Sequence, residues 1–137
     1  MGRRLLVTLL PAILFLLAIP GTAGAHILTA ETFFSRRKAP PGVVESGETV
    51  AIFGKLKSSA GECFVSQTVF LMRRQKGPNK TLARDVTDVE GEYIFQRRPR
   101  RNQKWYVRYH GYLLQDPSHT HNCLGTRSRV VKIRVER

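Results

Sequence analysis

Thr87-Asp88-Val89-Glu90-Gly91-Glu92-Tyr93-Ile94-Phe95 is the stretch that decides the fold class. Its first half is typical of a tight turn, because an Asp side chain accepts backbone N–H groups and a Gly adopts a positive φ easily. Its second half alternates, and we expect Tyr93 and Phe95 on the inward face of a strand. A tight turn that leads into an alternating strand indicates an antiparallel sheet with one solvated face.

The same alternation recurs along most of the chain. Seven segments are predicted to be strands: 27–35, 49–57, 68–74, 81–86, 92–96, 104–114 and 127–135. Turn residues separate them, and no segment has a convincing helical period of 3.6. We therefore expect an all-β fold, a sandwich of about seven antiparallel strands in which two sheets bury their apolar faces against each other.

The first 25 residues have the order of a secretory signal peptide. Arg3 and Arg4 precede an apolar run, and the small residues Ala23-Gly24-Ala25 end the segment. The apolar run is shorter than the roughly 20 residues that span a bilayer, and no second apolar segment follows, so we expect no transmembrane anchor in the mature chain. The chain is therefore divided into a leader, 1–25, and a single domain, 26–137, that is secreted or resides in the periplasm or cell envelope.

Cys63 and Cys123 are the two cysteines of the chain. An even pair in an exported protein indicates a disulfide, because thiols are oxidised outside the cytoplasm. Closing a loop of this size stabilises a fold by roughly 4 kcal/mol in the chain-entropy model. A free thiol or a metal thiolate is the alternative.

The charge is strongly basic, with 23 Lys and Arg against 10 Asp and Glu and a formal net charge of +13. Such a balance favours polyanionic partners, namely an anionic envelope polymer, a lipid surface or an acidic protein, and export makes nucleic acid an unlikely partner. The candidate contact residues lie in two basic segments, and they are Arg36, Arg37, Lys38, Arg97, Arg98, Arg100 and Arg101. The alternative is that a basic surface only keeps the protein soluble.

The strands carry further cations, including Arg73, Arg74, Lys104, Lys132 and Arg134. Arg suits phosphate, sulfate and carboxylate because its guanidinium binds them as a fork. Cations on strands also protect sheet edges from aggregation, which is the competing explanation for this set. On the outward face of its strand, Tyr106 is expected to offer a ring on which a sugar can stack.

Histidines provide the alternative function, a small periplasmic or extracellular copper-binding protein. Cleavage after Ala25 would make His26 the first residue, with an amine and an imidazole available to one ion. His119 and His121 add two imidazoles, and nitrogen ligands of this kind suit Cu(II). Two points oppose this site: we expect His119 and His121 to project to opposite sides of an extended segment, and nothing in the sequence places residue 26 beside them.

No catalytic constellation is visible. A nucleophile motif such as G-x-S-x-G and a Gly-rich phosphate loop are both absent, and Asp88 and Glu90 suit a turn better than acid–base chemistry. We therefore expect a protein that is not an enzyme and that needs no cofactor unless copper binds. Asn79-Lys80-Thr81 fits a glycosylation acceptor if the source glycosylates its exported proteins.

Three stretches together resemble the exported bacterial Ig-like, carboxypeptidase-regulatory-like (prealbumin-like) domains: 46–54 with Cys63 and 67–71, then 87–95, then 105–111 with Cys123 and Ser128. The resemblance extends from about Val44 to Val135. It implies a non-catalytic β-sandwich with an adhesive, carbohydrate-associated or structural role, and it brings no catalytic residues. The function expected from the sequence is thus an exported binding or structural module with a basic contact surface.

Overall fold

The computed structural model describes residues 26–30, 32–35, 42–115 and 119–136. Their strands are β1 (His26–Ala30), β2 (Thr32–Ser35), β3 (Val43–Glu45), β4 (Val50–Ser58), β5 (Thr68–Arg73), β6 (Lys80–Val86), β7 (Glu92–Arg97), β8 (Gln103–Tyr109), β9 (Tyr112–Gln115), β10 (His119–Cys123), β11 (Thr126–Arg127) and β12 (Val131–Glu136). One 3₁₀ turn, η1 (Gly61–Cys63), follows β4. Nowhere in these described ranges does a helix have the length and apolar character to cross a membrane.

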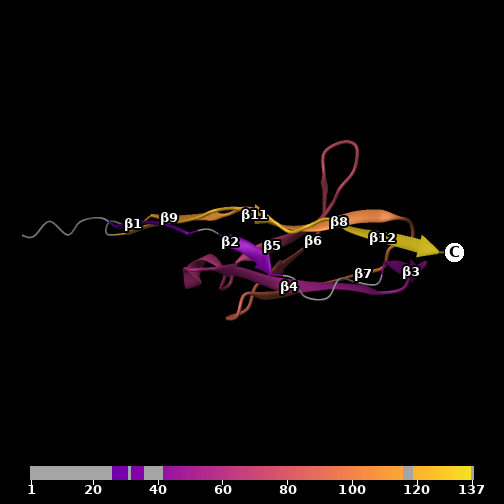
Figure 1. The fold of residues 1–137 in the computed structure, drawn as a ribbon, viewed down its shortest axis with the longest axis horizontal. Helices are drawn as coiled ribbons and strands as arrows, with labels where there is room; N and C mark the ends of the chain where they lie inside the picture. Colours follow the sequence, from indigo (N-terminus) through magenta and orange to yellow (C-terminus); the bar gives the residue numbers. More distant parts are fainter. Residues whose placement is uncertain (1–25, 31, 36–41, 116–118, 137) are drawn as a thin grey trace, which may run out of the picture.

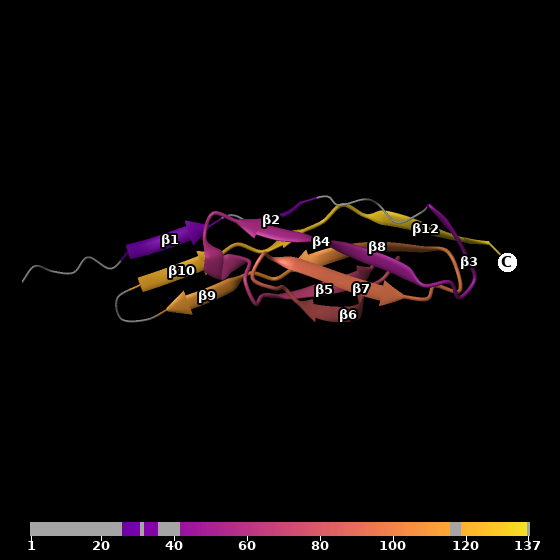
Figure 2. The same cartoon turned by 90° about the horizontal axis from the view of Figure 1, so that it is seen from below.

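The strands form three sheets with the orders β1-β10-β9, β3-β12-β8-β5-β6 and β2-β4-β7, and β11 pairs with β8. Figure 1 shows β4 and β7 in one layer and β8 and β12 in the other. The β1-β10-β9 sheet lies at one end of the long axis, beyond the two main layers (Figure 2). The all-β sandwich prediction is confirmed.

Side chains from both layers fill the core. Trp105 on β8 is 1 % exposed, and Leu71 on β5 and Ile133 on β12 are buried with it. From the other layer, Leu56 on β4 and Phe95 on β7 belong to the same cluster. The predicted inward positions of the alternating strands are therefore confirmed, and the cations between them point outward.

The hairpin that decided the fold class closes against β4. Gly91 has a φ of +79°, and its carbonyl oxygen accepts the N–H of Leu56 at 2.9 Å. A Cβ at this position would collide with the carbonyl oxygen of Leu56, so both conformation and space require Gly. Asp88 Oδ1 accepts the N–H groups of Glu90 and Glu92, each at 2.8 Å, as the turn prediction requires.

Three predicted strands are divided in the structure. The 27–35 segment contributes β1 and β2 to different sheets, 104–114 is split at Gly111 into β8 and β9, and 127–135 is split into β11 and β12. Gly111 has a φ of +88° and lies against the backbone of Cys123 and Gly125, which forces the chain to turn there. Two pairings, β1 with β10 and β12 with β3, are parallel in an otherwise antiparallel arrangement.

Candidate functional site

A basic groove lies at the end of the large sheet where β5 ends and β8 begins. Its volume is about 700 Å³. The cationic residues that line it, here called the groove cations, are Arg73, Arg74, Lys76, Arg101, Lys104, Lys132 and Arg134. The remaining lining residues are amides and one aliphatic side chain: Gln75, Asn102, Gln103 and Ile133. No carboxylate is among these lining residues, so the potential inside the groove is strongly positive.

Strand register aligns three of the groove cations across adjacent strands. Lys132 of β12 and Lys104 of β8 are direct cross-strand partners. On the other side of Lys104, the N–H of Arg74 donates to the Lys104 carbonyl oxygen at 2.8 Å. Like charges on directly opposed positions destabilise a sheet, so this row opposes folding unless an anion neutralises it.

The position of the row in the sheet argues against edge protection. β12 lies between β3 and β8, and β8 lies between β12 and β5, so neither is an edge strand of this sheet. Lys104 in particular has a paired neighbour on each side, Lys132 of β12 and Arg74 after β5, so it protects no open sheet edge. Protection from edge-to-edge aggregation, the competing explanation from the sequence, therefore does not account for Lys104.

The β5–β6 loop, residues 74–79, forms one wall of the groove and stands away from both layers in Figure 1. Its own hydrogen bonds hold it in shape. Gln75 Oε1 accepts from Arg73 Nε and Nη2 at 3.3 and 3.1 Å, and Gln75 Nε2 donates to the carbonyl oxygen of Pro78 at 2.7 Å. The Gln75 N–H donates to Asn79 Oδ1 at 3.4 Å. The loop therefore presents Arg73 in a defined position without neutralising its charge.

Two carboxylates, those of Glu90 and Glu92, pair with a lysine outside the groove. Lys55 Nζ lies 2.7 Å from Glu90 and 3.4 Å from Glu92, on the β4–β7 side of the sandwich. Lys55 hydrogen-bonds to these two carboxylates, first to Glu90, and its pKa is raised. Within the described ranges, none of the groove cations forms an ion pair. The positive charge of these side chains is therefore available to bind an anionic ligand.

A second depression of about 640 Å³ continues the groove on the other side of Arg74 and Gln75. It adds Arg127 and Arg129 to the cationic surface, and Tyr106 and Asn79 also line it. Tyr106 lies on the predicted outer face of β8, but it is only 6 % exposed and pairs across the strands with the buried Met72. The prediction that Tyr106 offers an open stacking surface is therefore wrong, because neighbouring residues cover it.

The predicted basic segment 97–101 contributes only Arg101 to the groove. Arg97 pairs with Val50 in the other sheet, and Arg98 Nε donates to Thr49 Oγ1 at 3.0 Å. Arg100 is exposed but does not line the groove. Arg36, Arg37 and Lys38 lie outside the described residues. The groove depends mainly on strand cations, whose convergence only the pairing of β12, β8 and β5 reveals.

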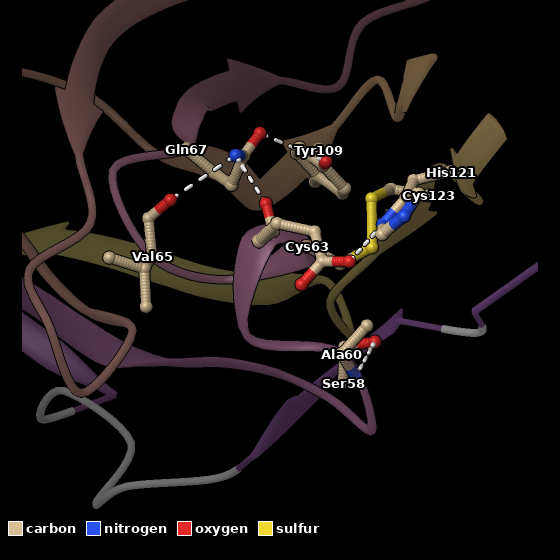
Figure 3. The surroundings of a disulfide bond; sticks show 9 residues. Ser58, Ala60, Cys63, Val65, Gln67, Tyr109, His121 and Cys123 are labelled. Atoms are coloured by element: carbon tan, nitrogen blue, oxygen red, sulfur yellow. Dashed lines mark hydrogen bonds and ion pairs between the residues drawn. A yellow bond between two sulfur atoms is a disulfide. The ribbon is translucent and has the colours of Figure 1, made fainter. Parts of the chain in front are cut away.

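The predicted disulfide is present between Cys63 of η1 and Cys123 of β10, with Cα atoms 5.3 Å apart. Beside it, His121 Nδ1 contacts Glu62 Oε1 (Figure 3). A disulfide and a side-chain contact therefore both connect η1 to β10. The pKa of Glu62 is lowered, chiefly by a hydrogen bond from its own backbone N–H and then by His121. The disulfide and this contact together hold the small β1-β10-β9 sheet against the sandwich.

The structure corrects both objections to the histidine site. His119 and His121 lie on the same face of β10, with ring centroids 6.1 Å apart, because residues at i and i+2 of a strand share a face. The parallel pairing of β1 with β10 puts the backbone of His26 in register with His119. Among the described residues, however, no group of three or more His, Cys, Asp or Glu side chains is arranged to hold a metal ion.

No protein-family model and no curated protein matches the chain. Among solved structures, it is similar to the sulfur carrier protein SoxY from Chlorobium limicola f thiosulfatophilum, with a TM-score of 0.41 and 13% identity over 82% of this chain and 87% of that one. It is also similar to a superoxide reductase (neelaredoxin) from Ignicoccus hospitalis, with a TM-score of 0.41 and 11% identity over 77% of this chain and 80% of that one. Similarity at this level is too low to transfer a fold or a function.

Proposed function

We propose that this chain is an exported, non-enzymatic binding module whose basic groove holds an anionic polymer of the cell envelope or extracellular space. The observation that carries the proposal is the set of seven groove cations with no carboxylate among them. Four of these cations (Arg73, Lys104, Lys132 and Arg134) lie on strands with a neighbour on each side, and the opposed pair Lys104–Lys132 weakens the sheet in the absence of an anion. Arg and Lys together suit repeated phosphate or sulfate groups, because Arg binds them as a fork and Lys as a point charge.

The shape of the site favours a polymer over the other two anionic partners expected from the sequence. The groove is recessed between the β5–β6 loop and the sheet, and the second depression continues it past Arg74. A linear chain can follow such a path and place one anionic group beside each cation. A flat lipid surface would meet the raised loop first, and an acidic protein would need a matching ridge.

Binding suits this site better than catalysis. The described lining residues of the groove supply guanidinium, ammonium and amide groups, with no imidazole, thiol or carboxylate to take up a proton. The Cys63–Cys123 disulfide supports export, because such bonds persist mainly in oxidising compartments. The sequence also predicts a leader at 1–25 and a resemblance to the Ig-like, carboxypeptidase-regulatory-like domains. The proposed function agrees with both predictions.

Binding of a linear polyphosphate and of a sulfated polysaccharide, titrated at several salt concentrations, tests the proposal. We expect the Lys104→Gln/Lys132→Gln double variant to bind at least about tenfold more weakly, since a hydrogen bond to a charged group contributes roughly 1.5–3 kcal/mol. The dependence of affinity on salt should also become shallower, because fewer counterions are exchanged on binding.

The matched control removes the same charge from the other sheet. Lys57 and Arg97 are exposed on β4 and β7, so Lys57→Gln/Arg97→Gln changes net charge equally and leaves the groove intact. This control should keep most of the affinity. Equal losses in the two double variants would show that net charge alone attracts polyanions. Stronger binding to anionic vesicles than to either polymer would favour a lipid surface.

A further inference from the structure

Two imidazoles converge on one face of β10 in the small sheet, and neither lines the basic groove. His119 and His121 share a face of β10, and their rings are edge to face with centroids 6.1 Å apart. The side chain of His121 is 25 % exposed, so solvent and small ions reach it. Paired imidazoles at this spacing can direct ring nitrogens toward one ion, and imidazole is a common ligand of divalent transition metals.

Glu62 fixes which nitrogen of His121 is available. Its carboxylate contacts Nδ1 of His121. A carboxylate that accepts the Nδ1–H bond holds the imidazole in one tautomer and leaves the Nε2 lone pair free. Histidines that bind metals usually donate their other ring N–H to a carboxylate or carbonyl in this way, which orients the ring and makes the ligand more basic.

The segment that carries Glu62 is itself held in place. Gln67 Nε2 donates to the Glu62 carbonyl oxygen at 2.7 Å, and Tyr109 Oη donates to Gln67 Oε1 at 3.0 Å. The adjacent Cys63 is joined to Cys123, two residues after His121 on β10 (Figure 3). Glu62 and His121 are thus fixed by covalent and hydrogen-bonded neighbours before any ligand arrives, and such preorganisation lowers the cost of binding.

We propose that His119 and His121 bind a divalent transition-metal ion, Cu(II) in preference to Zn(II), with Glu62 as the positioning residue that orients His121. Nitrogen donors favour Cu(II) in the general order of divalent metal affinities. Since the described residues hold no third His, Cys, Asp or Glu ligand, water completes the coordination of the ion. This site is separate from the basic groove, and the proposed function does not depend on it.

Titration of the purified full chain with Cu(II), followed by calorimetry and electron paramagnetic resonance, tests the site. The intact protein should bind one Cu(II) with nitrogen hyperfine structure from two imidazoles, and His119→Ala and His121→Ala should each lose at least about tenfold in affinity. His110→Ala is the matched control, because this imidazole packs on Phe70, with centroids 4.9 Å apart, on a different sheet. Equal loss in His110→Ala, or unchanged binding in His119→Ala/His121→Ala, would overturn the proposal.

Glu62→Gln tests the positioning role separately. Loss of such an outer partner typically weakens metal binding by about 10–100-fold. The resonance spectrum should also change, because His121 would no longer be held in one tautomer. A variant that keeps the affinity and spectrum of the intact protein would remove Glu62 from the site. In the unmodified protein, Cu(II) should selectively broaden the imidazole resonances of His119 and His121, which requires no variant to fold.

Discussion

Lys104 and Lys132 face each other on neighbouring strands, and the cost of this pair can be measured directly. Lys132→Glu converts a repulsive cross-strand pair into an attractive one and should raise the free energy of unfolding by about 0.2–1 kcal/mol. The same change should weaken polyanion binding, because it places a carboxylate inside the groove. Urea unfolding and the polymer titration should therefore move in opposite directions.

Lys132→Gln provides the intermediate case, since it removes the repulsion without adding an attraction. Its gain in stability should be smaller than that of Lys132→Glu. If both variants are less stable than the unmodified protein, the aliphatic part of Lys132 matters more than its charge. That result would contradict the interpretation that these cations reduce the stability of the fold in order to bind an anion.

Asp88 makes the stability of the hairpin depend on pH. Its pKa is lowered, first by the hydrogen bond from the Glu92 N–H and also by that from Glu90. A carboxyl whose folded pKa is depressed stabilises the fold above its unfolded pKa of about 3.9, and this contribution is lost as the pH falls through the folded value. Asp88→Ala should lower the urea midpoint at neutral pH, and the difference from the unmodified protein should shrink below about pH 3.9. A difference that stays constant from neutral to acid pH would contradict this account.

At the scale of elements, the turn between β6 and β7 fixes the approach of the hairpin to β4. Gly91→Ala should be strongly destabilising, because a left-handed conformation costs a non-Gly residue about 1–2 kcal/mol and the new Cβ also meets the Leu56 carbonyl oxygen. Gly47→Ala is the matched control, since Gly47 has a φ of +85° and open space around it. Thermal unfolding should show the larger loss for Gly91→Ala. Equal losses would mean that the contact with β4 adds nothing.

Long strands that alternate between core and solvent were predictable from the sequence, whereas the three-residue β3 and the little-buried β10 were not predicted. β7 and β12 alternate between core and solvent, so their inward residues were identified correctly. All four residues of β9 are exposed, and its first three were predicted only as the end of the 104–114 strand. β10 buries only Cys123, so it lacks the alternation that signals a strand. The groove was missed for a related reason. Its cations come from strands distant in sequence, and their pairing depends on the whole sheet.

At the scale of the whole molecule, the disulfide joins the small end sheet to the sandwich across a sequence separation of 60 residues. Replacing both cysteines by Ser should lower the free energy of unfolding by roughly 4 kcal/mol, because the unfolded chain gains conformational entropy when the loop is no longer closed. Hydrogen exchange should accelerate most in β9 and β10, which lie beyond the main layers (Figure 2). Uniform acceleration across β5 and β8 as well would show that the bridge stabilises the entire fold rather than its end.

The place of β12 has a consequence for the order in which the polypeptide acquires its shape. β12 comes after β3 and β8 in the sequence, yet it lies between them and pairs with both. A chain growing on the ribosome therefore holds β3 and β8 without the strand that joins them until residues 131–136 have emerged. The large sheet of such a chain therefore stays incomplete until its last strand is available to pair with both neighbours.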